Sequence, residues 1–288
     1  MNFILSTDST CDLSLEQFAQ YGIEHVSLSY RVDGEEYGGD SGKSMSLSDF
    51  YNAMREGKKT GTSMVNEQQA TEYFEGLLDK SEGKDILHVC FASVLSGTYE
   101  CMQKVANVLN ETHQNKIFVV DSKCACQGEG LLVMLVAEYA QNHTAKETYE
   151  YAESLKGKIV HLFTVDTLKY LCAGGRVSKA TATVGNLLSI KPVMCVDDEG
   201  HLVAKTKAIG RKASLNKLIA KTIEKFSGEY KKLYISHADC KDDADYLSQA
   251  LEEKLGIKAE VGNIGNVIGG HSGPGTVAIF FVGENRTF

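Results

Sequence analysis

Residues 86–99 read ILHVCFASVLSGTY, and this stretch decides the class of fold. Its first part, 86–91, is apolar and has the length and composition of a buried strand. Serines and a glycine follow, and a helical pattern begins near residue 97 and runs to about residue 110. A strand that passes through a short polar turn into a helix is typical of parallel α/β sheets. The stretch therefore predicts an α/β protein.

The same alternation of strand and helix extends to both sides of this stretch. Ser14 and Gln17 have the spacing of a capping box at the start of a helix that Gly22 can close, and Asn66 can cap another helix. Further strands and a helix are expected at 3–6, 26–30, 117–120 and 124–142. These elements predict a three-layer α/β/α domain with a mainly parallel sheet over residues 1–153.

A second pattern begins near residue 144, where Thr144 and Glu147 have the spacing of another capping box. An Asp-Asp-Glu-Gly turn at 197–200 lies between two apolar runs, which indicates an antiparallel hairpin. The expected elements are strands at 159–165, 193–196, 201–204 and 277–282 and helices at 211–227 and 241–255. Residues 154–288 are therefore expected to form a two-layer α/β domain with a mixed sheet, in which the continuously apolar last strand is central.

Composition excludes several classes of partner. The chain has 38 acidic and 30 basic side chains, and its net charge of −8 repels nucleic acid. The first eight residues lack the basic start of a signal peptide, and the longest apolar run, 131–137, is too short to cross a bilayer. We therefore expect a cytoplasmic protein without an integral membrane segment.

The eight cysteines are scattered and fall mostly within apolar segments, so we expect core residues rather than disulfides. Cys124 and Cys126 form a CxC pair, but the sequence contains no second pair at the spacing of a zinc site. No metal ligands are predicted.

Four polar segments follow predicted strands, at 6–11, 60–63, 93–98 and 262–275, and all but the first contain glycine. Ligands of open α/β sheets bind at the carboxyl ends of strands. Ser96 and Gly97 open a helix, whose free N–H groups suit an anion such as a carboxylate. The alternative is that Ser96 only caps its helix and that Thr62 and Ser63 are only turn residues.

Seven short motifs, in this order along the chain, resemble those of the DegV family. They are Asp8-Ser9-Thr10-Cys11-Asp12-Leu13, Gly61-Thr62-Ser63, Leu95-Ser96-Gly97-Thr98-Tyr99, Val120-Asp121-Ser122, Leu168-Lys169-Tyr170-Leu171 with Gly174-Gly175-Arg176, Ile190-Lys191-Pro192 and Ile268-Gly269-Gly270-His271-Ser272-Gly273-Pro274-Gly275. Together they span positions 8 to 275, so the chain is identified from its sequence as similar to this family.

The resemblance implies a fatty-acid-binding protein, similar to the binding subunits of bacterial fatty acid kinase. It implies a long-chain fatty acid in an apolar tunnel at the interface of the two domains, with no other cofactor and no catalytic residue. Thr62 and Ser93 match the carboxylate-binding positions, and Ser63, Ser96 and the amide of Gly97 are supporting candidates.

The family pattern also places Arg176 and His271 near the carboxylate or the acyl phosphate formed from it. It implies that a separate ATP-dependent kinase phosphorylates the bound acid and that the product feeds phospholipid synthesis.

Two departures from the family pattern stand out. Met64-Val65-Asn66 replaces the Gln-Pro-Ser of many relatives, which predicts a different shape for the head-group loop. Ile209 stands where relatives often carry an additional arginine before Gly210-Arg211, which weakens the assignment of Arg211 as a kinase contact.

Three other functions compete with this interpretation. Lys43 follows Gly42 as in a phosphate-binding loop, but Tyr37 stands where that motif requires its first glycine. A hydrolase would use Ser93 or Ser96 with His271, although no Gly-x-Ser-x-Gly turn surrounds either serine. A receptor for another anionic metabolite would need polar groups throughout its pocket, whereas a fatty acid needs an apolar channel.

Overall fold

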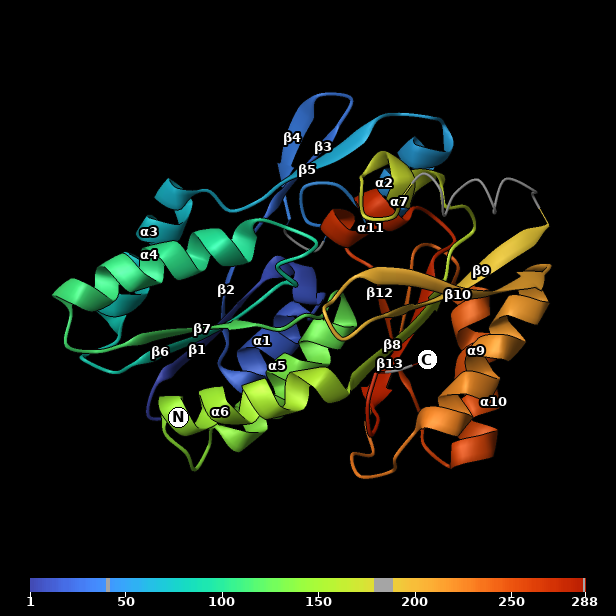
Figure 1. The fold of residues 1–288 in the computed structure, drawn as a ribbon. Coiled ribbons are helices and arrows are strands. Elements are labelled where there is room, and N and C mark those ends of the chain that lie inside the picture. The colour runs from blue at the N-terminus through green and yellow to red at the C-terminus, as the bar shows by residue number, and fades with distance from the viewer. Residues whose placement is uncertain (40–41, 179–188, 287) are drawn as a thin grey trace.

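The computed structural model describes residues 1–39, 42–178, 189–286 and 288, and contains two main sheets (Figure 1). The first is parallel, with strand order β2-β1-β6-β7. Its strands are β1 (Ile4–Asp8), β2 (Glu24–Val26), β6 (Ile86–Cys90) and β7 (Ile117–Asp121). The strand–turn–helix unit predicted at 86–99 therefore lies in the interior of this sheet.

Helices cover both faces of the parallel sheet, which gives the predicted three layers (Figure 1). One face carries α3 (Glu67–Lys80) and α4 (Thr98–Thr112), and the other carries α1 (Leu15–Tyr21), α5 (Gln127–Tyr139) and α6 (Ala145–Leu155). The capping box expected at the start of α1 is present, because Ser14 accepts from the Gln17 amide while Gln17 accepts from that of Ser14. Asn66 and Thr144 cap α3 and α6 in the same way.

The second sheet is mixed, with strand order β10-β9-β8-β13-β11-β12. Its strands are β8 (Ile159–Thr164), β9 (Ile190–Val196), β10 (Leu202–Ile209), β11 (Leu233–His237), β12 (Glu260–Asn263) and β13 (Val277–Val282). All six residues of β13 are buried, and the strand is central as its apolar sequence predicted. Helices α9 (Arg211–Lys225) and α10 (Lys241–Leu255) cover one face (Figure 1).

The prediction of an α/β fold with a mainly parallel sheet and a mixed sheet is confirmed. The division of the chain into domains 1–153 and 154–288 stays a prediction.

Helix α5 joins the two sheets. Eleven of its thirteen residues are buried, because it packs against α6 on one side and against β8, β11 and β13 on the other. This position explains why residues 131–137 are apolar on every side of the helix. Across the described residues, no helix is both long and apolar enough to cross a membrane.

The strand predicted at 26–30 is in fact two strands that belong to different sheets. The chain leaves β2 at Val26 and enters β3 (Ser29–Val32) after Leu28, whose amide donates to Ser9 Oγ at 3.0 Å. Apolar character continues across this bend because Leu28 is itself buried, so the sequence pattern did not reveal it.

Strand β3 belongs to a small antiparallel sheet of order β4-β3-β5, with β4 (Glu35–Gly38) and β5 (Thr60–Ser63). A turn at Asp33 and Gly34, both with positive φ, joins β3 to β4. Helix α2 (Leu47–Arg55) follows, and the segment around Lys43 that resembles a phosphate-binding loop includes residues 40 and 41, which lie outside the described part of the chain. The small sheet carries Thr62 to the candidate site.

Of the eight cysteines, six are buried and all eight are free thiols. Their expected role as core residues is confirmed at Cys11, Cys90, Cys101, Cys124, Cys126 and Cys195.

Candidate functional site

A cavity of about 250 Å³ lies between the small sheet, the loop after β6 and the mixed sheet. Most of its lining is apolar. The apolar lining comprises Leu28, Met64, Phe91, Leu95, Ala125, Phe163, Leu171, Val196, Leu202, Ile264, Val267, Ile268, Ala278 and Phe280. Polar side chains gather at one end, and we call Thr62, Ser96, Gly97, Arg176 and His271 the head-group cluster.

Thr62 and His271 come from different elements and form a hydrogen bond. Thr62 lies on β5 and His271 on α11 (Asn266–Ser272), and Thr62 Oγ1 is 2.8 Å from His271 Nε2. Thr60 fixes the two elements together by donating to the carbonyl of Gly270 at 3.1 Å. The ring of His271 packs on Gly174, where an added Cβ would lie only 2.3 Å from Nδ1, so a glycine is required there.

His271 is neutral at physiological pH. Burial, and then the charge of Arg176, lower the pKa of this histidine to about 4. With its proton on Nε2, the ring donates to Thr62 Oγ1, and the hydroxyl proton of Thr62 is then free to point into the cavity.

Arg176 brings a positive charge that no side chain of the described residues neutralises by an ion pair. Its Nε and Nη2 donate to the carbonyl of Leu95 at 3.1 and 3.0 Å, and its Nη1 donates to that of Gly174 at 2.5 Å. Burial lowers the pKa of this guanidinium, but an arginine stays charged at neutral pH. The polar end of the cavity therefore combines a cation with several neutral donors, which is an arrangement for an anion.

Ser96 and Gly97 lie at the start of α4 and line the same end of the cavity. Ser96 Oγ is 2.9 Å from Thr98 Oγ1 and accepts from the amide of Thr98 at 3.2 Å. Ser96 was expected either to bind an anion or only to cap its helix. Its hydroxyl accepts a hydrogen bond at the start of α4, and the residue also lines the cavity, so the two roles are compatible.

Ser93 and Ser63 do not line the cavity, although both were expected near the carboxylate. The hydroxyl of Ser93 donates to Asp121 Oδ2 at 2.7 Å, and its amide donates to Oδ1 at 3.1 Å. Ser63 follows Thr62 on β5, and successive side chains of a strand point to opposite faces. Of these four residues only Thr62 and Ser96 line the cavity, and the expected contact of all four with a carboxylate stays a prediction.

Arg211, which was considered as a contact for the kinase, forms hydrogen bonds within the chain. Its Nε donates to Asp243 at 2.9 Å, and its Nη2 donates to the carbonyl of Gly275 at 2.7 Å. The first bond connects the start of α9 to the start of α10, and the second connects α9 to the segment before β13. The expected contact of Arg211 with a kinase stays a prediction.

Behind the loop 91–97 lies a second polar group, in which Asp8 and Thr10 of the first family motif meet Glu129 of α5, a residue without an expected role. We call Asp8, Thr10 and Glu129, all fully buried, the carboxyl cluster. Asp8 Oδ2 accepts from the amide of Phe91 at 2.9 Å, so this cluster fixes the residue at which the loop 91–97 begins. The signal for Glu129 in the sequence was an acidic side chain in the first turn of α5, just before the apolar run 131–137.

The geometry of the carboxyl cluster requires a retained proton. Thr10 Oγ1 lies 2.6 Å from Asp8 Oδ1 and 2.8 Å from Glu129 Oε2, but a hydroxyl has one proton to donate. One carboxyl group must therefore be protonated and donate to Thr10. Burial raises the pKa of Asp8 and raises that of Glu129 well above its usual range, with the charge of Asp8 adding to the effect at Glu129.

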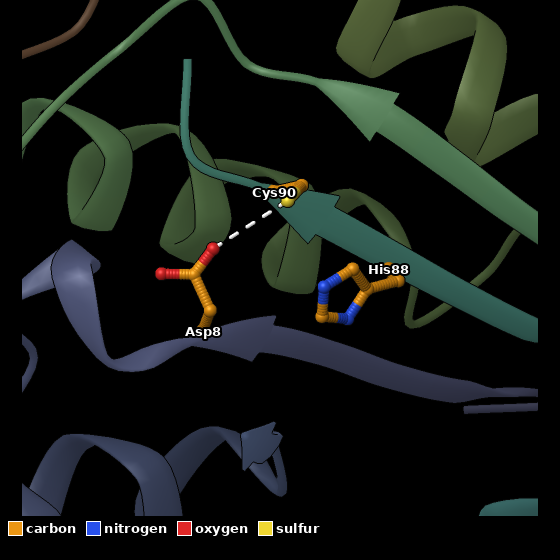
Figure 2. Close-up of side chains that lie close together, drawn as sticks. All are labelled: Asp8, His88 and Cys90. Carbon is orange, nitrogen blue, oxygen red and sulfur yellow. Dashed lines mark hydrogen bonds between the residues drawn. The ribbon is translucent and has the colours of Figure 1, made fainter. Parts of the chain in front are cut away.

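Asp8 also lies beside His88 and Cys90, and Figure 2 shows the three side chains on β1 and β6. Their ligand atoms all lie within 4.8 Å of one another, a combination of residue types that zinc can bind. However, both oxygens of Asp8 already accept hydrogen bonds, from Thr10, Phe91 and Cys90.

Burial raises the pKa of the Cys90 thiol well above its usual value, and this thiol donates to Asp8 Oδ2 at 3.6 Å. The site therefore fits a hydrogen-bonded network better than a metal centre.

The hydrolase interpretation requires a serine that donates to His271. In this structure Thr62 is the hydroxyl that bonds His271, while Ser93 bonds Asp121 and Ser96 bonds Thr98. The geometry therefore gives no support to a Ser–His pair at this site.

Comparisons with known proteins agree over the whole chain. A family model described as an uncharacterised protein of the DegV family matches residues 3–284. The DegV domain-containing protein CPE0026 of Clostridium perfringens is 37% identical over 289 aligned residues, which cover 99% of this chain and 98% of that protein.

Two solved structures have the same fold. A DegV lipid-binding protein of Thermotoga maritima superposes with a TM-score of 0.85 at 25% identity and covers 100% of both chains. A DegV family protein of Thermus thermophilus, described for its fatty acid binding, gives the same TM-score and identity over 98% of this chain and 100% of that chain.

Proposed function

This chain belongs to the DegV family, and from that membership we propose that it binds a long-chain fatty acid. The acyl chain occupies the apolar cavity, and the carboxylate lies at the head-group cluster. The observation that carries the proposal is the cavity itself, whose lining is mostly apolar and which has an arginine without an ion-pair partner among the described residues at one end.

The apolar part of the cavity supplies most of the affinity. Burial of each CH₂ group is worth about 0.8 kcal/mol, so a long acyl chain gains far more from the lining than any single polar contact can provide. A small polar metabolite would leave these apolar side chains without a partner, which argues against a receptor for such a ligand.

The head-group cluster holds the carboxylate and sets its position. A carboxylate that leaves water needs several donors, and this site offers the hydroxyls of Thr62 and Ser96, the amide of Gly97 and the guanidinium of Arg176. His271 acts through Thr62, because it accepts or supplies the proton that decides where the threonine hydroxyl points. We assign no catalytic residue.

The two solved relatives support a lipid ligand, since one is described as lipid-binding and the other for its fatty acid binding. By family resemblance, we further propose that a separate ATP-dependent kinase phosphorylates the bound carboxylate in the cytoplasm and that the acyl phosphate enters phospholipid synthesis. The chain would act as two domains, 1–153 and 154–288, with the lipid between them.

The first test is mass spectrometry of lipid extracted from the purified protein, followed by titration of the delipidated chain with fatty acid. Wild-type protein should carry and rebind a long-chain acid. Thr62→Ala should weaken binding by roughly 10- to 100-fold, because a hydrogen bond to a charged group is worth about 1.5–3 kcal/mol.

Ser63→Ala is the matched control, since it removes the neighbouring hydroxyl of the same strand on the face that does not line the cavity. Equal affinity of the two variants would refute the head-group assignment. A wild-type chain that carries no lipid and refuses added fatty acid would refute the proposed function.

A further inference from the structure

The cavity follows the central strand of the mixed sheet and then stops. Ala278 and Phe280 are alternate residues of β13 that share one face of the sheet and line the cavity, as does Thr276 just before the strand. Thr276 lies next to α11, which carries the head-group residue His271, because its hydroxyl donates to the carbonyl of Ser272 at 3.0 Å. Val282, the next residue on this face, is completely buried in the core and does not line the cavity.

On the neighbouring strand β8, the residues that line the cavity end at the same position along the sheet. Phe163 and His161 of β8 line the cavity, and they pair with Ala278 and Phe280 of β13. Ile159, the next residue on this face of β8, pairs with Val282 and lies in the core outside the cavity. The cavity therefore ends just beyond the pair of Phe280 and His161, before the pair of Val282 and Ile159. This end lies about 14 Å along the strand from Thr276.

The last pair belongs to a row that crosses four strands. Phe280 pairs with His161, and the register that pairs Leu162 with Cys195 places His161 beside Val196, which pairs with Leu202. All four members of this row line the cavity. We call Phe280, His161, Val196 and Leu202 the end row.

His161 makes the end row rigid. Its Nδ1 donates to the carbonyl of Ile159 at 3.0 Å, and its Nε2 accepts from the amide of Ala125 at 3.2 Å, so both ring nitrogens are used within the protein. The ring meets that of Phe280 edge to face, with centroids 5.3 Å apart. The backbone of Gly128 on α5 is so close to the ring that an added Cβ would lie 2.1 Å from Nε2.

We propose that the end row stops the methyl end of the acyl chain and sets the longest fatty acid that the protein binds well. The inference rests on the proposed function, which fixes the carboxylate at the opposite end of the cavity. A ligand held at its carboxylate gains affinity with each CH₂ until its methyl group meets the end row. A longer chain must then bend or leave part of its length in water.

The test is a titration of the delipidated protein with a homologous series of saturated fatty acids. Wild-type affinity should rise about fourfold per added CH₂ up to a cut-off and fall beyond it, since about 0.8 kcal/mol per CH₂ corresponds to that factor. Phe280→Ala should move the cut-off to longer acids. Gly128→Ala should also change the cut-off, because the new methyl group forces the His161 ring of the end row to shift.

Val282→Ala is the matched control, since it truncates the next residue on the same face of β13 beyond the end of the cavity, and it should keep the wild-type cut-off. Phe280→Leu makes the same test with a smaller change in the core, in case Phe280→Ala does not fold. A wild-type chain without a cut-off, or one cut-off shared by wild type, Phe280→Leu and Gly128→Ala, overturns the inference while leaving fatty acid binding intact. Failure of the wild type to bind any fatty acid overturns the proposed function itself.

Discussion

The head-group cluster and the carboxyl cluster are built from similar residue types and serve opposite purposes. Each combines a threonine hydroxyl with a titratable side chain, and each includes a residue at or next to the end of a strand. In the head-group cluster, Thr62 and His271 are half-buried and line the cavity. In the carboxyl cluster, Asp8 and Glu129 are fully buried, and their oxygens accept bonds from the protein.

The difference lies in the balance of donors and acceptors. The head-group cluster combines several donors with a positive charge, so its chemistry suits the anion that we propose as its ligand. The carboxyl cluster has an excess of acceptors, which backbone amides and one retained proton satisfy. Substitutions in the first should therefore change affinity more than stability, and substitutions in the second should change stability more than affinity.

The largest expected effect is that of Asp8→Ala on folding. The change leaves the buried amides of Thr10 and Phe91 without acceptors, and each unsatisfied group costs about 1–3 kcal/mol. We expect the free energy of unfolding, measured by urea denaturation, to fall by about 3 kcal/mol or more. Asp85→Ala is the control at the other end of β6, where water can replace the exposed bond to the Lys116 amide. Equal losses in the two variants would contradict the assigned role of the carboxyl cluster.

Arg176→Gln should give the reverse pattern. Loss of the cation should weaken fatty acid binding by roughly 10- to 100-fold, because a bond to a charged group is worth about 1.5–3 kcal/mol. The stability of the lipid-free chain should fall less than in Asp8→Ala, since the guanidinium has no carboxylate partner among the described residues and glutamine can still donate to one of the carbonyls of Leu95 and Gly174. Calorimetric titration and urea denaturation of the same samples check both parts, with the exposed Arg31→Gln as control. A large loss of stability with unchanged affinity would remove the distinction between the clusters.

Much of the fold was predictable because local signals agree with the tertiary structure. The spacing of Ser14 with Gln17 and of Thr144 with Glu147 gave two capping boxes correctly, and the apolar run 277–282 gave the central strand. The bend at Leu28 was missed, because burial of that residue continues the apolar pattern across two sheets.

The site was less predictable from the sequence, because serines of one loop differ in the direction of their side chains. Ser93 and Ser96 occupy the same polar segment, yet Asp121 holds the hydroxyl of Ser93 while Ser96 faces the cavity. The partner Asp121 is 28 residues away along the chain, and nothing in the local sequence indicates that contact. The end of the cavity was hidden for the same reason, since it depends on strand register.

A smaller effect is expected from Glu129→Gln, which tests the retained proton. The amide group of glutamine can donate to Thr10 as a protonated Glu129 does, so the network should survive. The pKa of Glu129 is raised in the folded chain from its ordinary value of 4.5. The contribution of this group to wild-type stability is therefore complete near and below pH 4.5, and it is lost as pH rises through the folded pKa.

The variant cannot ionise at this position, so its free energy of unfolding should fall less between pH 5 and pH 8. Denaturation at several pH values measures this difference. A steeper loss in the variant than in the wild type would mean that Glu129 is ionised in the native protein.

The smallest effect concerns His271 and the pH dependence of binding. The pKa of this histidine is about 4 in the lipid-free chain, so the ring is neutral at pH 8 and at pH 6. A carboxylate bound nearby favours the protonated ring and raises that pKa, so the complex takes up protons as pH falls. Fatty acid affinity should therefore rise as pH is lowered from 8 to 6, by less than tenfold per pH unit because one group is involved.

His271→Gln should abolish that rise, whereas the exposed His113→Gln should retain it. If the wild type and His271→Gln share one profile, the ring stays neutral beside the ligand and acts only by orienting the hydroxyl of Thr62. In that case a change of protonation would affect only the carboxyl cluster, through stability, and fatty acid binding at the head-group cluster would not depend on the protonation of His271.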